Sequence, residues 1–299
     1  MRPVRPAGAL LGVGLVLAGC SSGGGHAAVV ATTTQVADLA RHVAGRRLEV
    51  REILRPGSDP HEYEPRPSDA LAISHARLVL RSGGDVDGWL GGLVRQAGGH
   101  ARVVTLLDDV RRENGDPHWW QDPRNAERAV VAIRDALIRA DPADARDDRR
   151  NTAAYLERLR RLDAAIARCV ARIPPAARTL VTSHDSLGYY AHRYGFRVVG
   201  AAIPSLSSQA EPSAAATQRL VDQIRRAHVP AVFPESALNP KLERAIAREA
   251  HARVGGALWA DSLGPPGSSG ATYTGALASN TAAIVSALTG GRVRCRPPG

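Results

Sequence analysis

Three histidines lie in three widely separated segments, and each segment has a composition that suits a metal site. His61 lies in PGSDPHEYEP, His118 in NGDPHWWQDPRN and His184 in LVTSHDSLGYYAHRYG, and the first two segments share Asp-Pro-His. No local hairpin can unite residues this far apart in sequence, so only a fold that brings distant loops together would make them one site. Three neutral imidazoles would then supply most of a zinc coordination shell.

The segments around these loops predict strands and helices in alternation. In the first half, VVATTTQVADLARHVAG predicts a strand and an amphipathic helix that ends at Gly45, and a second strand follows from Leu48 to Leu54. SDALAISHA predicts a helix with Ser68 as its N-cap, and RLVLRSG and ARVVTLL predict two further strands. Strands that alternate with helices are typical of parallel sheets.

The second half of the chain repeats this order. Strands are predicted for TLVTSH, FRVVGAAI, AVFPES and GALWAD. Helices are predicted for SLGYYAHRYG, AATQRLVDQIRRAHV, PKLERAIAREAHARV and TYTGALASNTAAIVSALTGG. We therefore expect an α/β fold with two similar lobes, an N-terminal lobe over 29–140 and a C-terminal lobe over 176–299.

A long helix is expected between the lobes. Its pattern starts near Asn125, continues past Asp141-Pro142 and stops at Pro174-Pro175, and we assign the linker itself to 141–175. One face of this stretch carries apolar residues at helical spacing, namely Tyr155, Leu156, Leu159, Leu162 and Ile166. The predicted architecture is thus two lobes with parallel sheets joined by one long rigid helix, which should limit how far the lobes can move.

The three histidine loops fall where such a fold places a ligand site. His61 follows the strand that ends at Leu54, His118 follows the strand around 103–106, and His184 ends the strand TLVTS. Asp261, at the end of GALWAD, is a fourth candidate. In open α/β sheets, ligands bind outside the carboxyl ends of the strands, so the four residues should meet in the cleft between the lobes. Three imidazoles and one carboxylate complete a closed tetrahedral zinc shell.

Each residue also has a plain structural alternative. His61 and Asp261 could be turn residues, His118 could belong to the core with its neighbouring tryptophans, and His184 could lie at a helix cap. Their joint occurrence at equivalent strand ends favours the metal site. Carboxylates that could orient the imidazoles are Glu235, Asp122, Glu62 and Asp185. Glu235 is favoured because it ends a predicted strand, although it could instead cap the next helix.

The first residues predict export and a lipid anchor. Residues 1–19 combine basic, short apolar and small-residue regions, as in a secretory signal peptide, and Cys20 follows directly. Small residues that lead into a cysteine resemble the bacterial lipobox, which predicts lipidation of Cys20 and anchoring to the cell membrane by lipid alone. Residues 20–28 are expected to form a flexible tether.

Charge and cysteine usage narrow the function further. The formal net charge is +10, but arginine is spread along the helices without a basic run interleaved with aromatic residues, so nucleic-acid binding is not expected. Outside the cytoplasm, Cys169 and Cys295 could form a disulfide that joins the C-terminal tail to the long helix. They could equally remain free, and neither has the spacing of a thiolate metal site.

Six motifs in order resemble one family over nearly the whole mature chain. They are DPHEYEP, DPHWWQDPRN, TSHDSLGYYAHRYGF, PSLSSQAEPSA, FPESALNPKL and ADSLGPPGSSGATY. They resemble the ZnuA/TroA-like solute-binding lipoproteins, which deliver zinc or manganese to ABC importers. The resemblance implies a metal between two lobes, with His61, His118, His184 and Asp261 as ligands. Manganese-preferring members usually have Glu at the position of His184, so the resemblance favours Zn²⁺ over Mn²⁺.

The resemblance also sets the expected partner and the alternatives. The expected partner is the permease of an ABC importer, and the protein is expected to be a monomer without enzymatic activity. One departure is that the region before His118, DDVRRENGDPHWW, lacks the extra histidines found in many zinc-specific members. The alternatives are a metal-binding adhesin-like lipoprotein and a secreted zinc hydrolase with Glu235 as base. The hydrolase is disfavoured because the chain has neither HExxH nor Gly-x-Ser-x-Gly.

Overall fold

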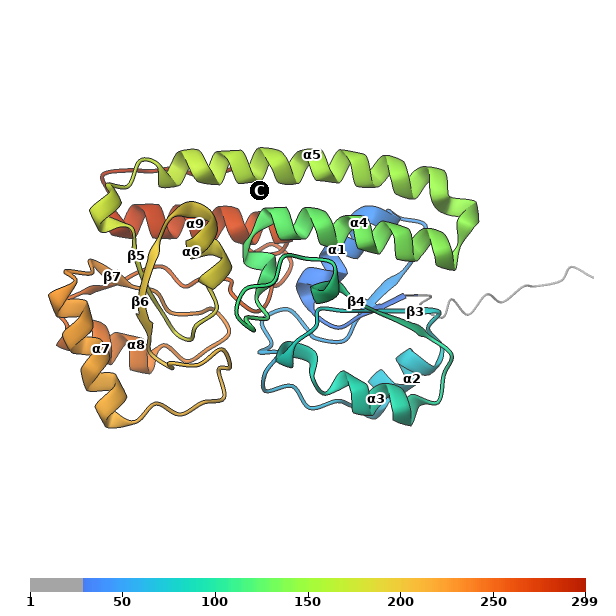
Figure 1. Cartoon of the computed structure of the whole chain (residues 1–299), viewed down its shortest axis with the longest axis horizontal. Helices are drawn as coiled ribbons and strands as arrows, with labels where there is room; N and C mark the ends of the chain where they lie inside the picture. Colours follow the sequence, from blue (N-terminus) through green and yellow to red (C-terminus); the bar gives the residue numbers. More distant parts are fainter. Residues whose placement is uncertain (1–28) are drawn as a thin grey trace, which may run out of the picture.

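Two α/β lobes lie side by side beneath a layer of helices (Figure 1). The structure is a computed structural model that describes residues 29–299. The predicted signal peptide, Cys20 and the tether lie outside the described residues. Within residues 29–299, no helix combines the length and apolar character needed to cross a bilayer.

The N-terminal lobe contains one four-stranded parallel sheet in the order β2-β1-β3-β4. Its strands are β1 (Val29–Ala31), β2 (Val50–Glu52), β3 (Leu78–Arg81) and β4 (Arg102–Thr105). Its helices are α1 (Thr34–Ala44), α2 (Pro67–Ser74) and α3 (Leu90–Ala97). The central strands β1 and β3 are apolar on both faces because helices cover both sides of the sheet, as expected for parallel sheets.

The C-terminal lobe repeats the same strand order. Its strands are β5 (Thr179–Thr182), β6 (Arg197–Ala201), β7 (Ala231–Val232) and β8 (Arg253–Val254). The pairs β5-β6 and β7-β8 are parallel, and a parallel bridge between Thr182 and Phe233 links β5 to β7. The resulting order, β6-β5-β7-β8, matches that of the N-terminal lobe. Its helices are α6 (Gly188–Tyr194), α7 (Ala214–Arg226), α8 (Lys241–Glu249) and α9 (Tyr273–Leu288).

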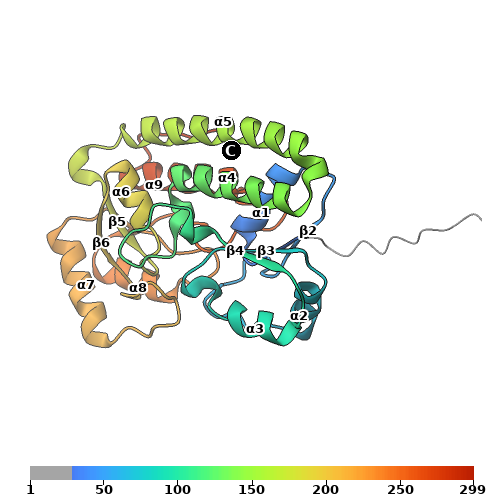
Figure 2. The same ribbon diagram turned by 45° about the vertical axis from the view of Figure 1, so that its right-hand side comes forward.

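One helix, α5 (Ala145–Val170), spans both lobes, as Figures 1 and 2 show from two directions. The prediction that the helix continues from Asn125 through Asp141-Pro142 is wrong. Helix α4 (Pro123–Ala140) ends there, and the chain reverses through a short 3₁₀ turn at Pro142–Asp144 so that α4 and α5 pack against each other. Pro142 cannot donate a backbone hydrogen bond, and the Asp141 side chain accepts one from the Ala143 amide instead.

The buried face of α5 holds the lobes together. Tyr155, Leu159, Leu162 and Ile166 repeat at helical spacing and are buried. The helix packs against α1 and α4 over the N-terminal lobe and against α9 over the C-terminal lobe. The largest hydrophobic cluster therefore runs without interruption through both lobes.

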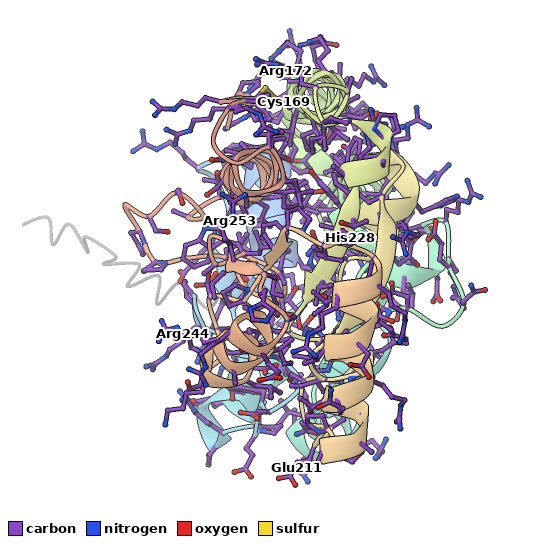
Figure 3. The ribbon with its side chains drawn as sticks, turned by 90° about the vertical axis from the view of Figure 1, so that its left-hand side faces the viewer. Cys169, Arg172, Glu211, His228, Arg244 and Arg253 are labelled. Atoms are coloured by element: carbon purple, nitrogen blue, oxygen red, sulfur yellow. A yellow bond between two sulfur atoms is a disulfide. The ribbon has the colours of Figure 1, made fainter. Side chains whose placement is uncertain are left out.

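A disulfide fastens the C-terminal tail to α5. Cys169, near the end of α5, is bonded to Cys295, and their Cα atoms are 5.7 Å apart. Figure 3 shows Cys169 at the edge of the molecule formed by α5, beside Arg172. The Arg172 guanidinium also donates a hydrogen bond to the carbonyl of Arg294 in the tail. Of the two states that the sequence left open, the structure has the bridged one.

Two local predictions are corrected, and one helix was not predicted. Helix α2 begins at Pro67 with Arg66 as N-cap, because Pro is favoured at the first helical position and Asp69 accepts the Arg66 amide. Ser68 therefore lies inside the helix. Helix α3 had not been predicted, since two glycines lower the helix propensity of LGGLVRQA. GALWAD forms only a single parallel bridge, between Leu258 and Glu235, instead of a strand.

Candidate metal centre

The four predicted residues converge between the lobes. His61, His118, His184 and Asp261 each direct one potential ligand atom inward, and these atoms all lie within 4.8 Å of one another. The rings of His118 and His184 are fully buried, and the side chains of His61 and Asp261 are 2% and 3% exposed. Residues from four loops, each after a different strand, thus form one buried cluster.

Local backbone geometry explains how two of the loops present their histidines. Asn114 and Gly115 both have positive φ, and a bridge joins Glu113 to Asp116, which makes a tight hairpin just before His118. His184 lies two residues after the end of β5, whose neighbour β7 leads to Glu235. The carboxyl ends of adjacent parallel strands therefore place His184 and Glu235 side by side.

The spacing of the ligand atoms suits a small tetrahedral cation. Asp261 Oδ2 lies 3.0 Å from His184 Nε2 and 3.3 Å from His61 Nε2. The Nε2 atoms of His118 and His184 are 3.3 Å apart, and His118 Nε2 is 3.6 Å from Asp261 Oδ1. Zinc–nitrogen bonds of 2.0–2.1 Å imply ligand–ligand separations of about 3.3 Å in a regular tetrahedron. The four distances given lie close to that value, and all separations in the cluster stay within 4.8 Å.

Three buried polar atoms at the centre of the cluster lack a well-aligned hydrogen-bond partner. His61 Nε2 and both carboxylate oxygens of Asp261 make no well-aligned hydrogen bond within residues 29–299, and their nearest polar neighbours are the other members of the cluster. Leaving such atoms buried and unsatisfied costs several kcal/mol unless a charge or a hydrogen-bond partner compensates. A divalent cation at the centre would satisfy all three atoms.

Two carboxylates fix the orientation of two of the rings. Asp116 Oδ1 lies 2.7 Å from His118 Nδ1, and Glu235 Oε1 lies 2.7 Å from His184 Nδ1. Each carboxylate accepts the Nδ1 proton, so the Nε2 lone pair is directed toward the centre. Glu235 also accepts the backbone N–H of His184, at 3.2 Å, and is 4% exposed.

Of the four carboxylates suggested by the sequence, only Glu235 hydrogen-bonds one of the rings. Asp122 is the N-cap of α4, where it accepts the Arg124 amide. Glu62 is exposed to solvent. Asp185 makes no hydrogen bond to a ring, and its backbone N–H donates to the carbonyl of Ser205.

Asp116 was missed from the sequence, although a signal for it was present. In both Asp-Pro-His segments the aspartate accepts a hydrogen bond from the backbone N–H of the histidine two residues later: Asp59 accepts from His61, and Asp116 accepts from His118. The Asp116 carboxylate reaches the His118 ring as well. The shared motif therefore orders the loop before each histidine.

The charges in the cluster are strongly coupled. Burial lowers the pKa of His184, but the Asp261 and Glu235 carboxylates outweigh burial and raise it to about 11. Burial raises the pKa of Asp261, yet the His184 and His118 rings hold it well below its usual range. Without a metal, the site therefore keeps a proton on His184, next to a charged Asp261.

We expect the two orienting carboxylates to matter for metal affinity. Replacing Glu235 with Gln or Asp116 with Asn should weaken zinc binding roughly 10- to 100-fold, because each imidazole loses a charged acceptor for its Nδ1 proton. Asp122→Asn is the matched control, since asparagine also caps helices well. Competition titration against a chromophoric chelator would measure the three affinities, and equal losses in all three variants would contradict the assignment.

Comparison with known proteins identifies the family. Residues 29–287 match the family model described as ZnuA, zinc-uptake complex component A, periplasmic. The chain belongs to this family. The family predicted from the six motifs is thereby confirmed. Relatives of the chain include metal-binding proteins named as lipoproteins, and one of them, PsaA of Streptococcus pneumoniae, is named as the substrate-binding lipoprotein of a manganese ABC transporter.

Curated relatives cover most of the chain but differ in the metal that their names state. The chain is 32% identical to the manganese-binding lipoprotein MntA of Halalkalibacterium halodurans, over 93% of this chain and 96% of the relative. It is 34% identical to the iron-binding protein YfeA of Yersinia pestis, over 79% and 78% of the two chains. It is 30% identical to the zinc-binding protein TroA of Treponema pallidum, over 88% and 89%. Family membership therefore leaves the metal open.

Solved structures confirm the fold. The periplasmic zinc-binding protein TroA of Treponema pallidum superposes with a TM-score of 0.81 at 29% identity, and the match covers 87% of this chain and 98% of that one. A manganese-bound periplasmic metal-binding protein from Candidatus Liberibacter asiaticus gives a TM-score of 0.79 at 25% identity, with 87% and 98% covered. The two-lobed architecture is thus shared with metal-binding proteins of this family.

Proposed function

We propose that this protein is an extracytoplasmic lipoprotein that binds Zn²⁺ and delivers it to an ABC importer. His61, His118, His184 and Asp261 are the proposed ligands. The observation that carries the proposal is a buried cluster at tetrahedral spacing, in which the inward atoms of His61 and Asp261 have no hydrogen-bond partner among residues 29–299. In the same cluster, the Nδ1 atoms of His118 and His184 are held by carboxylates.

The ligand set supports zinc as the preferred cargo. Imidazole nitrogens make up three of the four proposed ligands, and sites rich in imidazole suit zinc, whereas manganese prefers carboxylate and water oxygens. Titration of Zn²⁺ and Mn²⁺ into the metal-free protein should give the tighter binding for zinc. Metal analysis of the protein as purified provides an independent check. Tighter binding of manganese would overturn the zinc assignment while leaving the metal site itself intact.

Coordination number can be tested with cobalt. Asp261 directs one oxygen toward His118 and the other toward His61 and His184. Binding through one oxygen gives a tetrahedral ion, and binding through both gives a five-coordinate one. We expect the strong visible absorption of tetrahedral Co²⁺ in the substituted protein. A weak five-coordinate spectrum would show that Asp261 binds through both oxygens.

The same geometry argues for binding and release over hydrolysis. A catalytic zinc usually has three protein ligands and keeps one position open for water. Here four side chains surround the centre, and Glu235, the proposed base of a hydrolase, is held by His184. Delivery to an importer predicts that deleting the gene slows growth when zinc is scarce and that added zinc restores it. Impaired surface adhesion with normal zinc uptake would favour the adhesin-like alternative.

The lipid anchor remains a separate proposal that rests on Cys20. Labelling cells with a radioactive fatty acid should modify the natural protein and leave Cys20→Ala unlabelled. The variant should be released into the medium or the soluble extracytoplasmic fraction. Equal labelling of both forms would place the lipid elsewhere on the chain.

Zinc binding should weaken as the pH falls. Because the pKa of His184 is raised to about 11, its ring is protonated at neutral pH in the metal-free protein, and zinc must displace that proton. The pKa of His61 is also raised, since Asp261 outweighs the effect of burial, so a second proton competes at lower pH. The dissociation constant should rise about tenfold per pH unit for each proton displaced. Calorimetry in buffers of different ionisation enthalpy would count the protons, and a pH-independent constant would contradict the scheme.

A further inference from the structure

The segment that carries Asp261 is attached to the opposite lobe. Asp261 follows β8 in sequence and so belongs to the C-terminal lobe. However, the backbone N–H of Leu263 donates to Thr34 Oγ1, and the N–H of Gly57 donates to the Leu263 carbonyl. The same Gly57 amide also contacts Ser262 Oγ at 2.9 Å. These partners lie in α1 and in the loop that carries His61, both in the N-terminal lobe.

The strongest attachment is at the carbonyl group of Ala260, directly before Asp261. Three side chains donate hydrogen bonds to this one oxygen: Trp120 Nε1 at 2.8 Å, Gln121 Nε2 at 2.9 Å and Gln35 Nε2 at 3.5 Å. All three are at most 2% exposed, and all belong to the N-terminal lobe. A carbonyl oxygen has two lone pairs, so three buried donors use its full capacity as an acceptor.

Gln121 has no other hydrogen-bond partner that would explain its burial. Its Oε1 atom is buried without a partner among residues 29–299, so its donation to Ala260 is the only hydrogen bond that its side chain makes there. Burying an amide with half of its hydrogen bonds unmade costs free energy. The side chain is therefore placed for its contact with Ala260.

The attachment changes from one lobe to the other between neighbouring residues. Trp259 still bonds to the C-terminal lobe, because its amide donates to Asn280 Oδ1 and its carbonyl accepts from Asn280 Nδ2. Leu258 likewise donates to the carbonyl of Pro234 beyond β7. From Ala260 to Leu263, the backbone hydrogen bonds to other segments of the chain all reach the N-terminal lobe. Within the stretch, the Ser262 hydroxyl donates to the Leu263 carbonyl.

We propose that Gln121, Trp120 and Gln35 are positioning residues that hold Asp261 in the metal site through the Ala260 carbonyl. The proposal rests on the proposed metal-binding function and deepens it. The carbonyl of Ala260 and the Cα of Asp261 share one planar peptide unit, so fixing that oxygen fixes the direction in which the Asp261 side chain leaves the backbone. One short segment, residues 118–121, thus contributes to two ligand positions. His118 is itself a proposed ligand, and Trp120 and Gln121 hold the loop that carries Asp261.

As a result, the four proposed ligands are divided unequally between the two lobes. His61 and His118 belong to the N-terminal lobe and Asp261 is attached to it, whereas His184 is held in the C-terminal lobe through Glu235. The aspartates that order the first two loops also accept hydrogen bonds from the C-terminal lobe, Asp59 from Ser208 and the Asp116 carbonyl from Tyr189. Trp120 also packs against the His118 ring, whereas the Gln121 side chain bonds only to the Ala260 carbonyl among residues 29–299, so the contribution of Gln121 to metal binding should act through Asp261.

Gln121→Met tests this arrangement because it removes the donor while nearly preserving the shape of the side chain. We expect zinc affinity to fall about tenfold, at the lower end of the range for groups that orient ligands. The absorption of bound Co²⁺ should also change, since Asp261 is less well held. Gln218→Met on the exposed face of α7 is the matched control and should leave both unchanged. Gln35→Met should have a smaller effect, because its hydrogen bond is longer.

A double-mutant cycle with Asp261→Ala separates positioning from a general loss of stability. If Gln121 acts through Asp261, Gln121→Met should weaken zinc binding in the natural background and have no further effect in Asp261→Ala. An equal loss in both backgrounds would overturn the proposal, as would an unchanged affinity in the single variant. Circular dichroism of the metal-free variants shows whether they are folded. If Gln121→Met does not fold, the same cycle can be measured with Gln35→Met. Failure of the natural protein to bind zinc would instead reject the proposed function.

Discussion

Replacing His184 with Ala should weaken zinc binding roughly 100- to 1000-fold. Structural zinc sites contribute about 10–16 kcal/mol in total, so one ligand in four accounts for about 2.5–4 kcal/mol. The loss of affinity should fall at the upper end of this range, because the variant also leaves the buried Glu235 carboxylate without its hydrogen bond to His184. Competition titration with a chelator of known affinity measures the change.

His192 provides the matched control for this experiment. It lies on α6, close to His184 in sequence, but its ring is 59% exposed and pairs with Glu113 outside the cluster. His192→Ala should bind zinc as tightly as the natural protein. An unchanged affinity in His184→Ala would show that the four-ligand site is wrong, whereas a large loss in His192→Ala would point to a second site on α6.

Removing the disulfide should lower the free energy of unfolding by about 2–4 kcal/mol. Cys169 and Cys295 are separated by 126 residues, so the bridge closes a long loop and removes much conformational freedom from the unfolded chain. Chemical denaturation of Cys169→Ala/Cys295→Ala, compared with the oxidised natural protein, measures the difference. Alanine is preferred to serine because Cys169 is buried.

Two comparisons make this prediction specific. The reduced natural protein should lose as much stability as the double variant, because both lack the same covalent link. Zinc affinity should be unchanged in either form, since neither cysteine contacts the four residues of the metal centre. A difference in stability below about 0.5 kcal/mol would show that the packing of the tail already fixes its position without the bridge.

The position of the site could be predicted from the sequence because strand ends are easy to locate. His184 lies two residues after the end of the strand TLVT, and parallel strands direct their carboxyl ends to one edge of a sheet. His118 lies further from its strand, but the Asp-Pro-His that it shares with His61 indicated a second loop of the same kind. The predicted position of Asp261 depended on a strand over GALWAD, and in the structure that strand is reduced to one bridge.

Two features were missed from the sequence for different reasons. Asp122 and Asp116 are both aspartates next to proline near His118, and the one whose carboxylate reaches the ring is Asp116, which shares the Asp-Pro-His pattern and closes the hairpin at Asn114-Gly115. The end of α4 was missed because helical periodicity continues on both sides of Pro142. The chain reversal there depends on the packing of α4 against α5, which a one-dimensional pattern does not describe.

The position of α5 also determines where an ion can leave. The helix is 26 residues long, about 39 Å, and it packs over both lobes on one side of the molecule (Figure 1). Lobes that share one backing helix can separate only by pivoting about it, so the gap widens on the face opposite α5. On the proposed function, the metal leaves on this one side, and the transporter that receives the ion approaches that face.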